Sequence, residues 1–409
     1  MLYGLKKAGY QACLVGGGVR DLLLGREPKD FDVATNASPE QVKATFRNCR
    51  LIGRRFRLAH VHFGRNIIEV ATFRANLEPE NDGDVHVENG RIIRDNVFGS
   101  IEEDVWRRDF TVNALYYDIR DFSVIDYVGG YEDLQQGILR MIGDPVARYH
   151  EDPVRMLRAV RFAVKLGMRI EENTEKPIFE LAGLLEEISP ARLFEEVLKL
   201  FHSGNALQTF EALRHYGLFR PLFPMTDRIL CGEAEGFPHT LIAEALKSTD
   251  KRIQSGKPVN PAFLFAAMLW EPMQEILLPL INQGMPEIQA IQLATDKAFS
   301  HQRKSISVPR RFAIMVKEIF VLQFRLMHCS GKRPFRSLEH PRFRAAYDFL
   351  VIRSIADDRL QELAQWWTTF QECDDAARNA MLVPNENKKR RRKRRKPKVK
   401  PATSTLKDA

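Results

Sequence analysis

The hydrophobic pattern of this chain changes near residue 144, and that change restricts the fold more than any other feature. Before it, short runs of β-branched and aromatic residues alternate with helix signals, whereas after it apolar residues recur at three- and four-residue spacing. Runs of the first kind predict strands, and spacing of the second kind predicts amphipathic helices. A chain of 409 residues is also too long for one compact core. We therefore predict an α+β multidomain protein whose strands lie mainly before residue 144.

Individual elements follow from the same patterns. Strands are predicted at residues 11–15, 31–34, 67–71, 113–119 and 124–127, and a helix at 19–24 that ends at Gly25. Residues 75–96 are polar and rich in Asn, Asp and Gly, which predicts a loop or a loose hairpin. In the second region, helices are predicted at 151–166, 191–202 and 207–216, and less regular ones at 261–280, 309–327 and 343–367.

The positive charge of the chain is concentrated in its last residues. Eleven of the Lys and Arg residues lie between 388 and 400, where there is no acidic residue. Removing these eleven charges from the net charge of +9 leaves about −2 for residues 1–387. We expect residues 384–409 to be a disordered polybasic tail that tethers RNA through its phosphates. Composition alone also fits a nuclear-localisation signal or attraction to an anionic membrane surface. The RNA contacts expected in the tail are Lys388, Arg391 and Arg394.

Composition excludes several other classes of protein. The five cysteines lie far apart without a Cys-x-x-Cys pair, which favours reduced thiols in a cytoplasm over a zinc site or a disulfide framework. The N-terminus lacks the order of basic, apolar and small residues found in a signal peptide. No apolar run approaches the length that spans a bilayer, and the best of them, at 261–270, predicts a buried helix.

The segment Leu14-Val15-Gly16-Gly17-Gly18-Val19-Arg20-Asp21 has the composition of a phosphate-binding turn. A strand that runs into glycines at a helix start exposes backbone N–H groups and the positive end of the helix dipole. Arg20, one turn into the helix, can add a bidentate contact to a phosphate oxygen. Asp21 departs from the dinucleotide-binding G-x-G-x-x-G pattern. The glycines alone are equally typical of a plain turn.

Asp30 and Asp32 form a candidate metal site. If both lie on one strand, they face the same side while Phe31 points into the core. Two carboxylates on one face repel each other unless a cation lies between them, which is how two divalent ions are held for phosphoryl transfer. An isolated Asp-x-Asp is also common at the solvated end of a strand. Its position nine residues after Asp21 favours the metal site.

Two further carboxylates are candidates for the same site. Glu69 interrupts an otherwise apolar strand, where an unpaired acid would be costly. Asp109 follows Arg107 and Arg108, which have the chemistry to hold phosphates. A structural ion pair between Asp109 and those arginines is an equally good interpretation.

The predicted helix at 151–166 has two distinct faces. Asp152, Arg155 and Arg158 recur at three-residue spacing, opposite an apolar face. Such a pattern is typical of an exposed salt-bridged helix. It also has the chemistry of a base reader, because a carboxylate accepts from an exocyclic amine while a guanidinium donates to a ring nitrogen. Asp152 with Arg155 would then accept adenine or cytosine and reject guanine and uracil.

These motifs resemble those of the class II nucleotidyltransferases, the family of bacterial poly(A) polymerases and CCA-adding tRNA nucleotidyltransferases. The matching segments are LVGGGVRDLLLG at 14–25, PKDFDVAT at 28–35, RRDFTVNAL at 107–115, DYVGGYEDL at 126–134 and EDPVRMLRAVRFAVKLG at 151–167. The resemblance implies a DNA polymerase beta-like head with a small mixed or antiparallel sheet, followed by all-α domains. We expect the head at 1–142, the neck at 143–217, the body at 218–383 and the tail at 384–409.

The resemblance also implies roles for individual residues. Asp30 and Asp32 would bind two Mg²⁺ ions, for which Mn²⁺ can substitute, with Asp109 as a further active-site acid and Glu69 as a further candidate ligand. ATP would be the substrate. The pair Asp152 and Arg155 would serve as a protein template for the incoming base. The implied nucleotide-binding residues are Gly17, Gly18, Arg20, Arg108, Asn113, Asp152, Arg155 and Arg158.

The choice between poly(A) and CCA addition depends on residues 51–62, which resemble a segment of the bacterial poly(A) polymerases. Arg54, Arg55 and Arg57 surround Phe56 there, a composition suited to an RNA backbone and equally to a solvated basic strand edge. Segments 260–268 and 340–348 also resemble the helical part of those enzymes. The sequence has no His-Asp dipeptide, so nothing supports the phosphohydrolase domain of some CCA-adding relatives.

We therefore expect template-independent addition of AMP from ATP to RNA 3′ ends, including those of mRNA and of small regulatory and structured RNAs. The resemblance further implies a role in RNA turnover with RNA-decay proteins, and we expect a cytoplasmic monomer with peripheral membrane association left open. CCA addition to tRNA is the first alternative, because it uses the same head. A catalytically silent RNA-binding protein is the second, and the intact pair Asp30 and Asp32 disfavours it.

Overall fold

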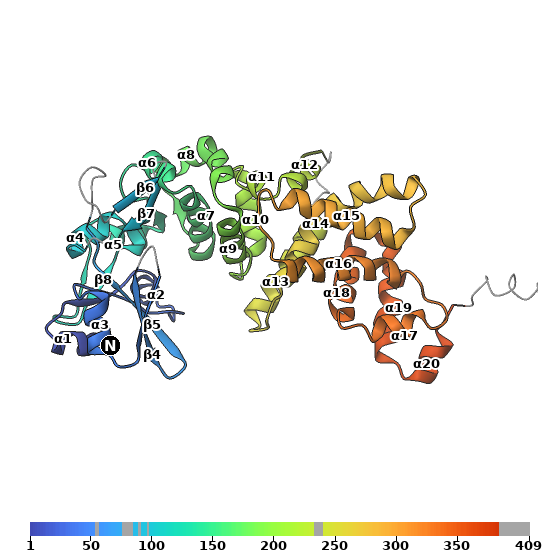
Figure 1. Ribbon diagram of the computed structural model, residues 1–409, viewed down its shortest axis with the longest axis horizontal. Coiled ribbons are helices and arrows are strands. Elements are labelled where there is room, and N and C mark those ends of the chain that lie inside the picture. The colour runs from blue at the N-terminus through green and yellow to red at the C-terminus, as the bar shows by residue number, and fades with distance from the viewer. Residues whose placement is uncertain (54–56, 76–84, 89–90, 96–97, 233–239, 384–409) are drawn as a thin grey trace, which may run out of the picture.

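A computed structural model shows a mixed α/β head joined end to end with a long array of helices (Figure 1). The structure describes residues 1–53, 57–75, 85–88, 91–95, 98–232 and 240–383. The strands lie in the N-terminal part of the chain, apart from a short parallel pair that joins β10 (Ile138–Leu139) to β11 (Arg169–Ile170). The predicted α+β multidomain class, with a mixed sheet in the head and a helical body, is therefore confirmed.

The head is built on one seven-stranded sheet in the order β3-β4-β5-β2-β1-β8-β9. The strands are β1 (Ala12–Val15), β2 (Asp32–Thr35), β3 (Cys49–Ile52), β4 (Leu58–Phe63), β5 (Asn66–Thr72), β8 (Tyr116–Asp118) and β9 (Ser123–Ile125). Neighbours are antiparallel except β2 and β5, which are parallel. This order places β2 in the centre of the sheet, beside both β1 and β5.

Short helices and a separate hairpin complete the head. The helices are α1 (Leu2–Lys7), α2 (Gly17–Leu23), α3 (Pro39–Thr45), α4 (Ile101–Trp106), the 3-10 turn η1 (Thr111–Asn113) and α5 (Gly130–Gln136). The helices α3 and α4 both begin with a capping box, in which a serine side chain and a Gln or Glu three residues later cap each other's backbone N–H. The hairpin of β6 (Val85–Glu88) and β7 (Arg91–Asp95) agrees with the hairpin predicted at 75–96, part of which lies outside the described residues.

Three predictions about the head need correction. Strands β3 and β4 were not predicted, although His60 and His62 of β4 alternate with its buried residues Ala59 and Val61, the pattern typical of a strand. The strand predicted at 113–119 starts later, since η1 occupies its first residue. The helix predicted at 19–24 is α2, which starts at Gly17, because Gly16 adopts a φ of 71° that ends the strand and turns the chain directly into the helix.

The rest of the described chain is helical. Next to the head lie α6 (Pro145–Glu151), α7 (Val154–Leu166), α8 (Glu172–Leu181), η2 (Ala182–Glu187), α9 (Pro190–Phe201), α10 (Ala206–His215) and α11 (Phe219–Leu222). Beyond them lie α12 (Pro224–Gly232), α13 (Thr240–Gln254), α14 (Pro261–Asn282), α15 (Glu287–Gln302), α16 (Arg310–Leu326), α17 (Arg333–Leu338), α18 (Phe343–Ala356), η3 (Asp358–Leu360), α19 (Gln361–Glu372) and α20 (Asp375–Ala380). One buried apolar cluster continues from Leu14 in the head to Ile352 in α18, so head and helices share a core.

Two predicted helices differ in the structure. The helix expected at 151–166 starts only at Val154, as α7, because Glu151 ends the preceding helix α6 and Asp152 and Pro153 lie between the two. Pro153 disfavours helical geometry at the residue before it, and Asp152 accordingly has φ −149° and ψ 92°. The helix expected at 343–367 is divided at Asp357, whose side chain accepts from the backbone N–H of Arg359 and caps η3.

The helix α14 covers Pro261–Asn282, 22 residues, which agrees with the helix predicted at 261–280 and contains the apolar run at 261–270. Among the described residues, this is the one helix long and apolar enough by length and composition to cross a membrane, and 61% of its most apolar window is buried inside the protein. It packs against α12, α13, α15 and α16. This burial favours a core helix over a membrane span, because a core helix can be equally long and apolar.

Two adjacent glycines allow a test of the packing between α5 and η1. A Cβ atom at Gly130 would lie 2.2 Å from the carbonyl oxygen of Thr111, whereas a Cβ at Gly129 would meet nothing within 4 Å. Gly130→Ala should therefore lower the free energy of unfolding by about 2–3 kcal/mol, because backbone must move. Gly129→Ala, at φ +75°, should cost about 1 kcal/mol. Chemical denaturation measures both, and an equal or larger loss in Gly129→Ala would contradict this account.

Candidate active site

The glycine turn connects β1 to α2 at the edge of the site. The backbone N–H of Gly16 donates to the carbonyl oxygen of Leu115 at 3.1 Å, which ties the turn to the end of η1. A Cβ at Gly18 would lie 3.4 Å from the carbonyl oxygen of Asp30, a tight contact. Glycine at this position therefore lets the segment with Asp30 pass close to the start of α2.

Arg20 lies beneath this turn and is only 3% exposed. Its guanidinium donates to Asp21 at 2.7 Å and to the side chain of Asn113 in η1. It also lies 5.5 Å from the centre of the Phe162 ring of α7. Arg20 thus joins α2, η1 and α7. These contacts do not test whether Arg20 also binds a phosphate, and that role stays a prediction.

Asp30 and Asp32 both have exposed positions at the start of β2. The strand begins at Asp32, so Asp30 and Phe31 precede it and the alternation expected of a strand does not apply to them. The prediction that Phe31 points into the core is consequently wrong, since Phe31 is 42% exposed.

Glu69 lies beside Asp32, because β2 and β5 are parallel and these two residues are register partners. His60 of β4 contacts the Glu69 carboxylate at 3.3 Å. Although Asp32 is exposed, partial desolvation by the surrounding protein raises the pKa of its carboxyl. The charges of Glu69 and Asp30 raise this pKa further, against an opposing effect of Arg108. The acids Asp30, Asp32 and Glu69 therefore repel one another where the strands meet.

This set of acids fits a divalent cation by its chemistry. Carboxylate oxygens are the ligands that Mg²⁺ and Mn²⁺ prefer, and the mutual repulsion at Asp32 is relieved by positive charge. Within the part of the chain that the structure describes, no three His, Cys, Asp or Glu side chains are already arranged to hold a metal ion. The assignment of Asp30, Asp32 and Glu69 as metal ligands stays a prediction.

Asp109 makes the ion pair that one interpretation of the sequence expected, but with a different arginine. Its partner is Arg158 of α7, whose Nε lies 2.7 Å from the carboxylate, and not Arg107 or Arg108. The Asn113 side chain and the Phe110 backbone N–H also donate to it. Burial alone would raise the pKa of Asp109, but Arg158 and these donors outweigh it and lower the pKa.

The two arginines before Asp109 have separate surroundings. Arg108 donates to Asp104 of α4 at 3.0 Å and to the Tyr116 hydroxyl at 2.7 Å. Burial lowers the pKa of Arg107 to about 10, with Arg74 and Arg148 adding to the effect. Sequence reasoning missed Asp104 and Tyr116, although the i, i+4 spacing of Asp104 and Arg108 was visible.

The three charged residues of the predicted base-reading face do not pair with one another. Asp152 accepts from Arg192 of α9 at 2.7 Å, Arg155 donates to Glu151 at 2.7 Å, and Arg158 holds Asp109. Because Asp152 lies in the break before α7, it does not share a helix face with the other two.

These side chains nevertheless line one cavity of about 320 Å³. It lies between the end of the head, α7 and α9. Sequence reasoning missed Arg192 and Glu196, whose i, i+4 spacing on a helix was the available signal. The lining residues are Arg107, Arg108, Asp109, Asp152, Val154, Arg155, Arg158, Arg192 and Glu196.

The predicted RNA contacts are only partly described. Arg57 is exposed and pairs with Glu40 at 2.7 Å. Arg54, Arg55, Lys388, Arg391 and Arg394 lie outside the described residues.

Comparison with known families and relatives identifies this arrangement. The family model described as the poly A polymerase head domain matches residues 12–140, and one described as the probable RNA and SrmB- binding site of polymerase A matches residues 167–230. A third, the polymerase A arginine-rich C-terminus, matches residues 283–400. The chain is 53% identical to a poly(A) polymerase I of Salmonella typhi over 93% of its own length and 83% of that protein. The chain belongs to the bacterial poly(A) polymerase family.

More distant relatives share the fold. A CCA-adding enzyme of Bacillus licheniformis is 40% identical, over 58% of this chain and 58% of that protein. A solved structure of a tRNA nucleotidyltransferase complexed with a primer tRNA and an incoming ATP analog superposes with a TM-score of 0.60 at 24% identity, covering 90% of this chain and 98% of that chain. The bacterial poly(A) polymerases are thus similar to this chain over far more of its length than the CCA-adding enzyme.

The repulsion among the acids at Asp32 predicts that the effect of Asp32→Asn on the melting temperature depends on whether a divalent cation is present. A carboxyl whose pKa is raised by folding stabilises the fold while protonated, and this contribution is lost as the pH rises through the folded-state pKa. At neutral pH in EDTA, Asp32→Asn should therefore melt above the parent protein, and the difference should shrink as the pH falls. With Mg²⁺, the parent protein should gain more melting temperature than the variant.

The matched control is Glu186→Gln, which removes one negative charge from an exposed residue far along the chain. Its melting temperature should follow the parent protein in both buffers. Equal Mg²⁺ responses of Asp32→Asn and the parent protein would contradict the metal assignment.

The pair of Asp109 and Arg158 predicts a strong energetic coupling. Arg158→Met should lower the free energy of unfolding by about 3 kcal/mol, because it leaves a carboxylate that is only 11% exposed without its counterion. The double variant Asp109→Asn with Arg158→Met should recover part of that loss. The exposed pair of Lys176 and Glu172 serves as control, with a coupling of about 0.5 kcal/mol. Double-mutant cycles from urea denaturation give both values, and comparable couplings would refute the prediction.

Proposed function

We propose that this protein adds AMP from ATP to RNA 3′ ends without a nucleic-acid template and releases pyrophosphate. The observation that carries the proposal is 53% identity to a poly(A) polymerase I over 93% of the chain, with the acids of the site intact. The enzyme class is accordingly a polynucleotide adenylyltransferase.

The chemistry follows from the acids at the start of β2. Asp30 and Asp32, with Glu69 as the adjacent carboxylate, would hold two divalent ions, Mg²⁺ or Mn²⁺. Bound there, such ions lower the pKa of an attacking hydroxyl and stabilise the charge of a leaving pyrophosphate. The glycine turn would position phosphate oxygens through its backbone N–H groups. Arg20 and Arg108 maintain the geometry by holding η1 and α4 against the sheet.

Base selection is assigned to the cavity at the break between α6 and α7. Asp152 receives one hydrogen bond from Arg192 and one from the Val154 backbone N–H, which leaves acceptor sites on its carboxylate for an exocyclic amine. Arg155 is held by Glu151 and by the carbonyl oxygen of Arg148, and it keeps further N–H groups for a ring nitrogen. Adenine presents both partners, as does cytosine.

RNA would be held outside this site by basic segments. The match to the RNA- and SrmB-binding model at residues 167–230 supports a role for the neck, and the polybasic tail supplies a nonspecific tether. We infer a role in mRNA processing and RNA decay, in company with RNA-decay proteins. We further infer a cytoplasmic monomer, a membrane surface being an alternative partner of the tail.

The alternative with a specific observation behind it is CCA addition to tRNA. It is favoured by the 40% identity to a CCA-adding enzyme, although over 58% of the chain. The base-reading chemistry does not separate the two functions, since it accepts both adenine and cytosine. A silent RNA-binding protein would have no use for the acids at Asp30 and Asp32.

Nucleotide preference tests the proposal directly. With an unstructured RNA and ATP alone, the protein should add long tails, whereas CTP should be used poorly. The double variant Asp30→Ala with Asp32→Ala should lose at least about 10³-fold in extension rate while still binding RNA. An extension that needs CTP and stops after three nucleotides on tRNA lacking its 3′ end would establish the alternative instead.

A further inference from the structure

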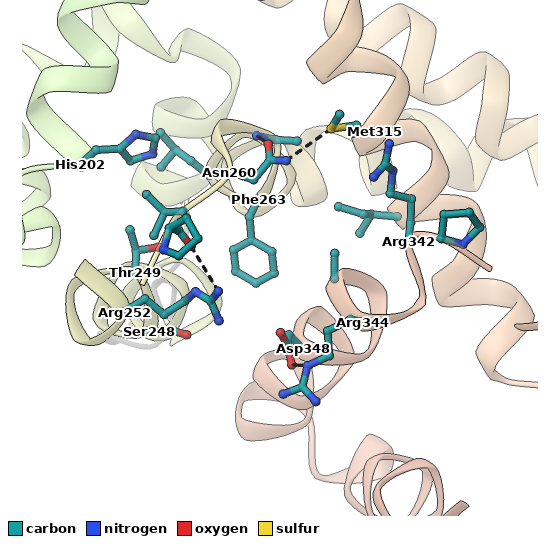
Figure 2. A pocket seen from close by; sticks show the side chains of 17 residues that line it. His202, Ser248, Thr249, Arg252, Asn260, Phe263, Met315, Arg342, Arg344 and Asp348 are labelled. Carbon is teal, nitrogen blue, oxygen red and sulfur yellow. Dashed lines mark hydrogen bonds and ion pairs between the residues drawn. The ribbon is translucent and has the colours of Figure 1, made fainter. Parts of the chain in front are cut away.

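A cavity of about 290 Å³ lies in the helical body, apart from the site described above. It is bounded by α13, α14, α16 and α18, with His202 at the end of α9 on one side (Figure 2). These helices lie well away from the strands of the head (Figure 1). The cavity shares none of its lining residues with the active-site cavity. Its volume is at the lower limit for ligand sites, roughly 300–1,000 Å³, which restricts it to a small ligand.

One wall of the cavity is aromatic and apolar. The ring of Phe263 lies in the middle of the lining side chains and is only partly buried (Figure 2). It packs against Phe349, with the ring centres 5.9 Å apart and the planes nearly perpendicular. Met315 and Ile319 of α16 continue this wall. A fixed, accessible aromatic face of this kind suits stacking of a flat ring.

Three arginines lie around the cavity on different sides of Phe263, namely Arg252, Arg342 and Arg344 (Figure 2). Arg252 donates to the carbonyl oxygen of Pro258 at 3.2 Å, Arg342 to Glu318 at 3.1 Å, and Arg344 to Asp348 at 3.0 Å. A guanidinium has five N–H groups, so each arginine keeps donors for a phosphate.

The remaining polar groups keep the lining positive and can bind a base edge. Burial lowers the pKa of His202, so the lining of three arginines and one aspartate carries about +2 at neutral pH. Asn260 caps α14 through its oxygen, while its NH₂ group faces the sulfur of Met315 at 3.5 Å, a weak acceptor that a base could replace.

We infer that this cavity binds one nucleotide of the RNA chain upstream of the 3′ end, with its base against Phe263 and its phosphate on Arg252 and Arg344. The inference rests on the proposed function for its choice of ligand. A free nucleotide has the same chemistry, but a second groove favours RNA. That groove shares Arg252, Arg344 and Asp348 with the cavity and continues along basic and aromatic residues, namely Lys251, Lys257 and Tyr347. A backbone leaving the cavity thus meets further positive charge.

The helix α9 connects this cavity to the active site. Arg192 near its start lines the active-site cavity, and His202 just after its end lines the body cavity. Ten residues of helix correspond to roughly 15 Å, or about four to five stacked nucleotides at ~3.4 Å each. An RNA shorter than about five nucleotides should therefore not fill both sites.

The test compares RNA length and matched arginine variants. Arg252→Gln with Arg344→Gln removes the proposed phosphate contacts, and Lys247→Gln with Arg325→Gln removes the same charge from exposed positions outside both cavities. Fluorescence anisotropy with a twelve-nucleotide oligo(A) gives the Kd, and extension of a trinucleotide primer gives the basal activity. The first pair should weaken binding at least about 10-fold and reduce the salt slope of log K by about 1, because one phosphate contact is lost. It should leave trinucleotide extension and the KM for ATP unchanged.

A third variant tests stacking without a change in charge. Phe263→Leu keeps an apolar side chain but removes the flat face, and it should weaken binding of the long RNA about 10-fold. Melting temperatures close to that of the parent protein check that the variants fold. Phe263→Tyr keeps the flat ring and should bind the long RNA as the parent protein does. That result would show that Phe263→Leu weakens binding through lost stacking and not through a packing defect.

Three outcomes would overturn the inference. The first is an equal loss of affinity in the cavity pair and in the control pair. The second is an equal loss on trinucleotide and long RNA. The third is binding of AMP alone, measured by equilibrium dialysis, that the cavity variants abolish while their RNA affinity is unchanged, which would assign the cavity to a free nucleotide. Failure of the parent protein to extend any RNA would instead refute the proposed function, and the anisotropy comparison would still decide the cavity.

Discussion

The ion pair of Asp109 and Arg158 is the contact on which the rest of the site depends. It joins the end of the head to α7, and its carboxylate also accepts from Asn113. Asn113 in turn accepts from Arg20, which is bonded to Asp21 beyond the glycine turn. One buried chain of hydrogen bonds therefore connects the neck helix α7 to the glycine turn. Low local dielectric strengthens such a network when every member is satisfied and makes the loss of one member costly.

The same network bears on the two candidates for a third carboxylate, Asp109 and Glu69. Asp109 is committed to Arg158 and to two further donors, and its lowered pKa reflects this stabilisation of its charge. Among the residues that the structure describes, Glu69 has His60 as its one side-chain hydrogen-bonding partner. It lies opposite Asp32 and raises the pKa of that residue. Uncompensated negative charge is what a divalent cation requires. The geometry thus favours Glu69 as the companion of Asp32, with Asp109 positioning the neck.

Sequence reasoning predicted what depends on local pattern and missed what depends on tertiary partners. The change from strands to helices and the turn before α2 follow from residue spacing. The break at Asp152 could also have been predicted from the sequence, because Pro153 restricts the backbone of the residue before it. The pairing of Asp109 with Arg158 was not, since residues 49 positions apart meet only once the fold is known. The prediction for Phe31 was wrong for a different reason. Side chains alternate along a strand, so an error of one residue in the position of its start changes the side to which a side chain points.

The arrangement of charges explains how one chain can act on RNA without reading it. In the active-site cavity, Asp152, Arg155 and Arg158 are each paired with a charged partner, which fixes their orientation and suits recognition of a single base. In the body cavity, Arg252 and Arg344 each use an N–H group for a contact within the protein and keep further N–H groups. Such groups can bind the phosphates of an RNA of any sequence. Base selection by the paired side chains and RNA binding by the arginines should depend differently on salt. Only the arginines bind RNA phosphates and so release counterions from the RNA. An enzyme that must grow a uniform tail needs both, the first for the incoming nucleotide and the second for the chain that moves past it.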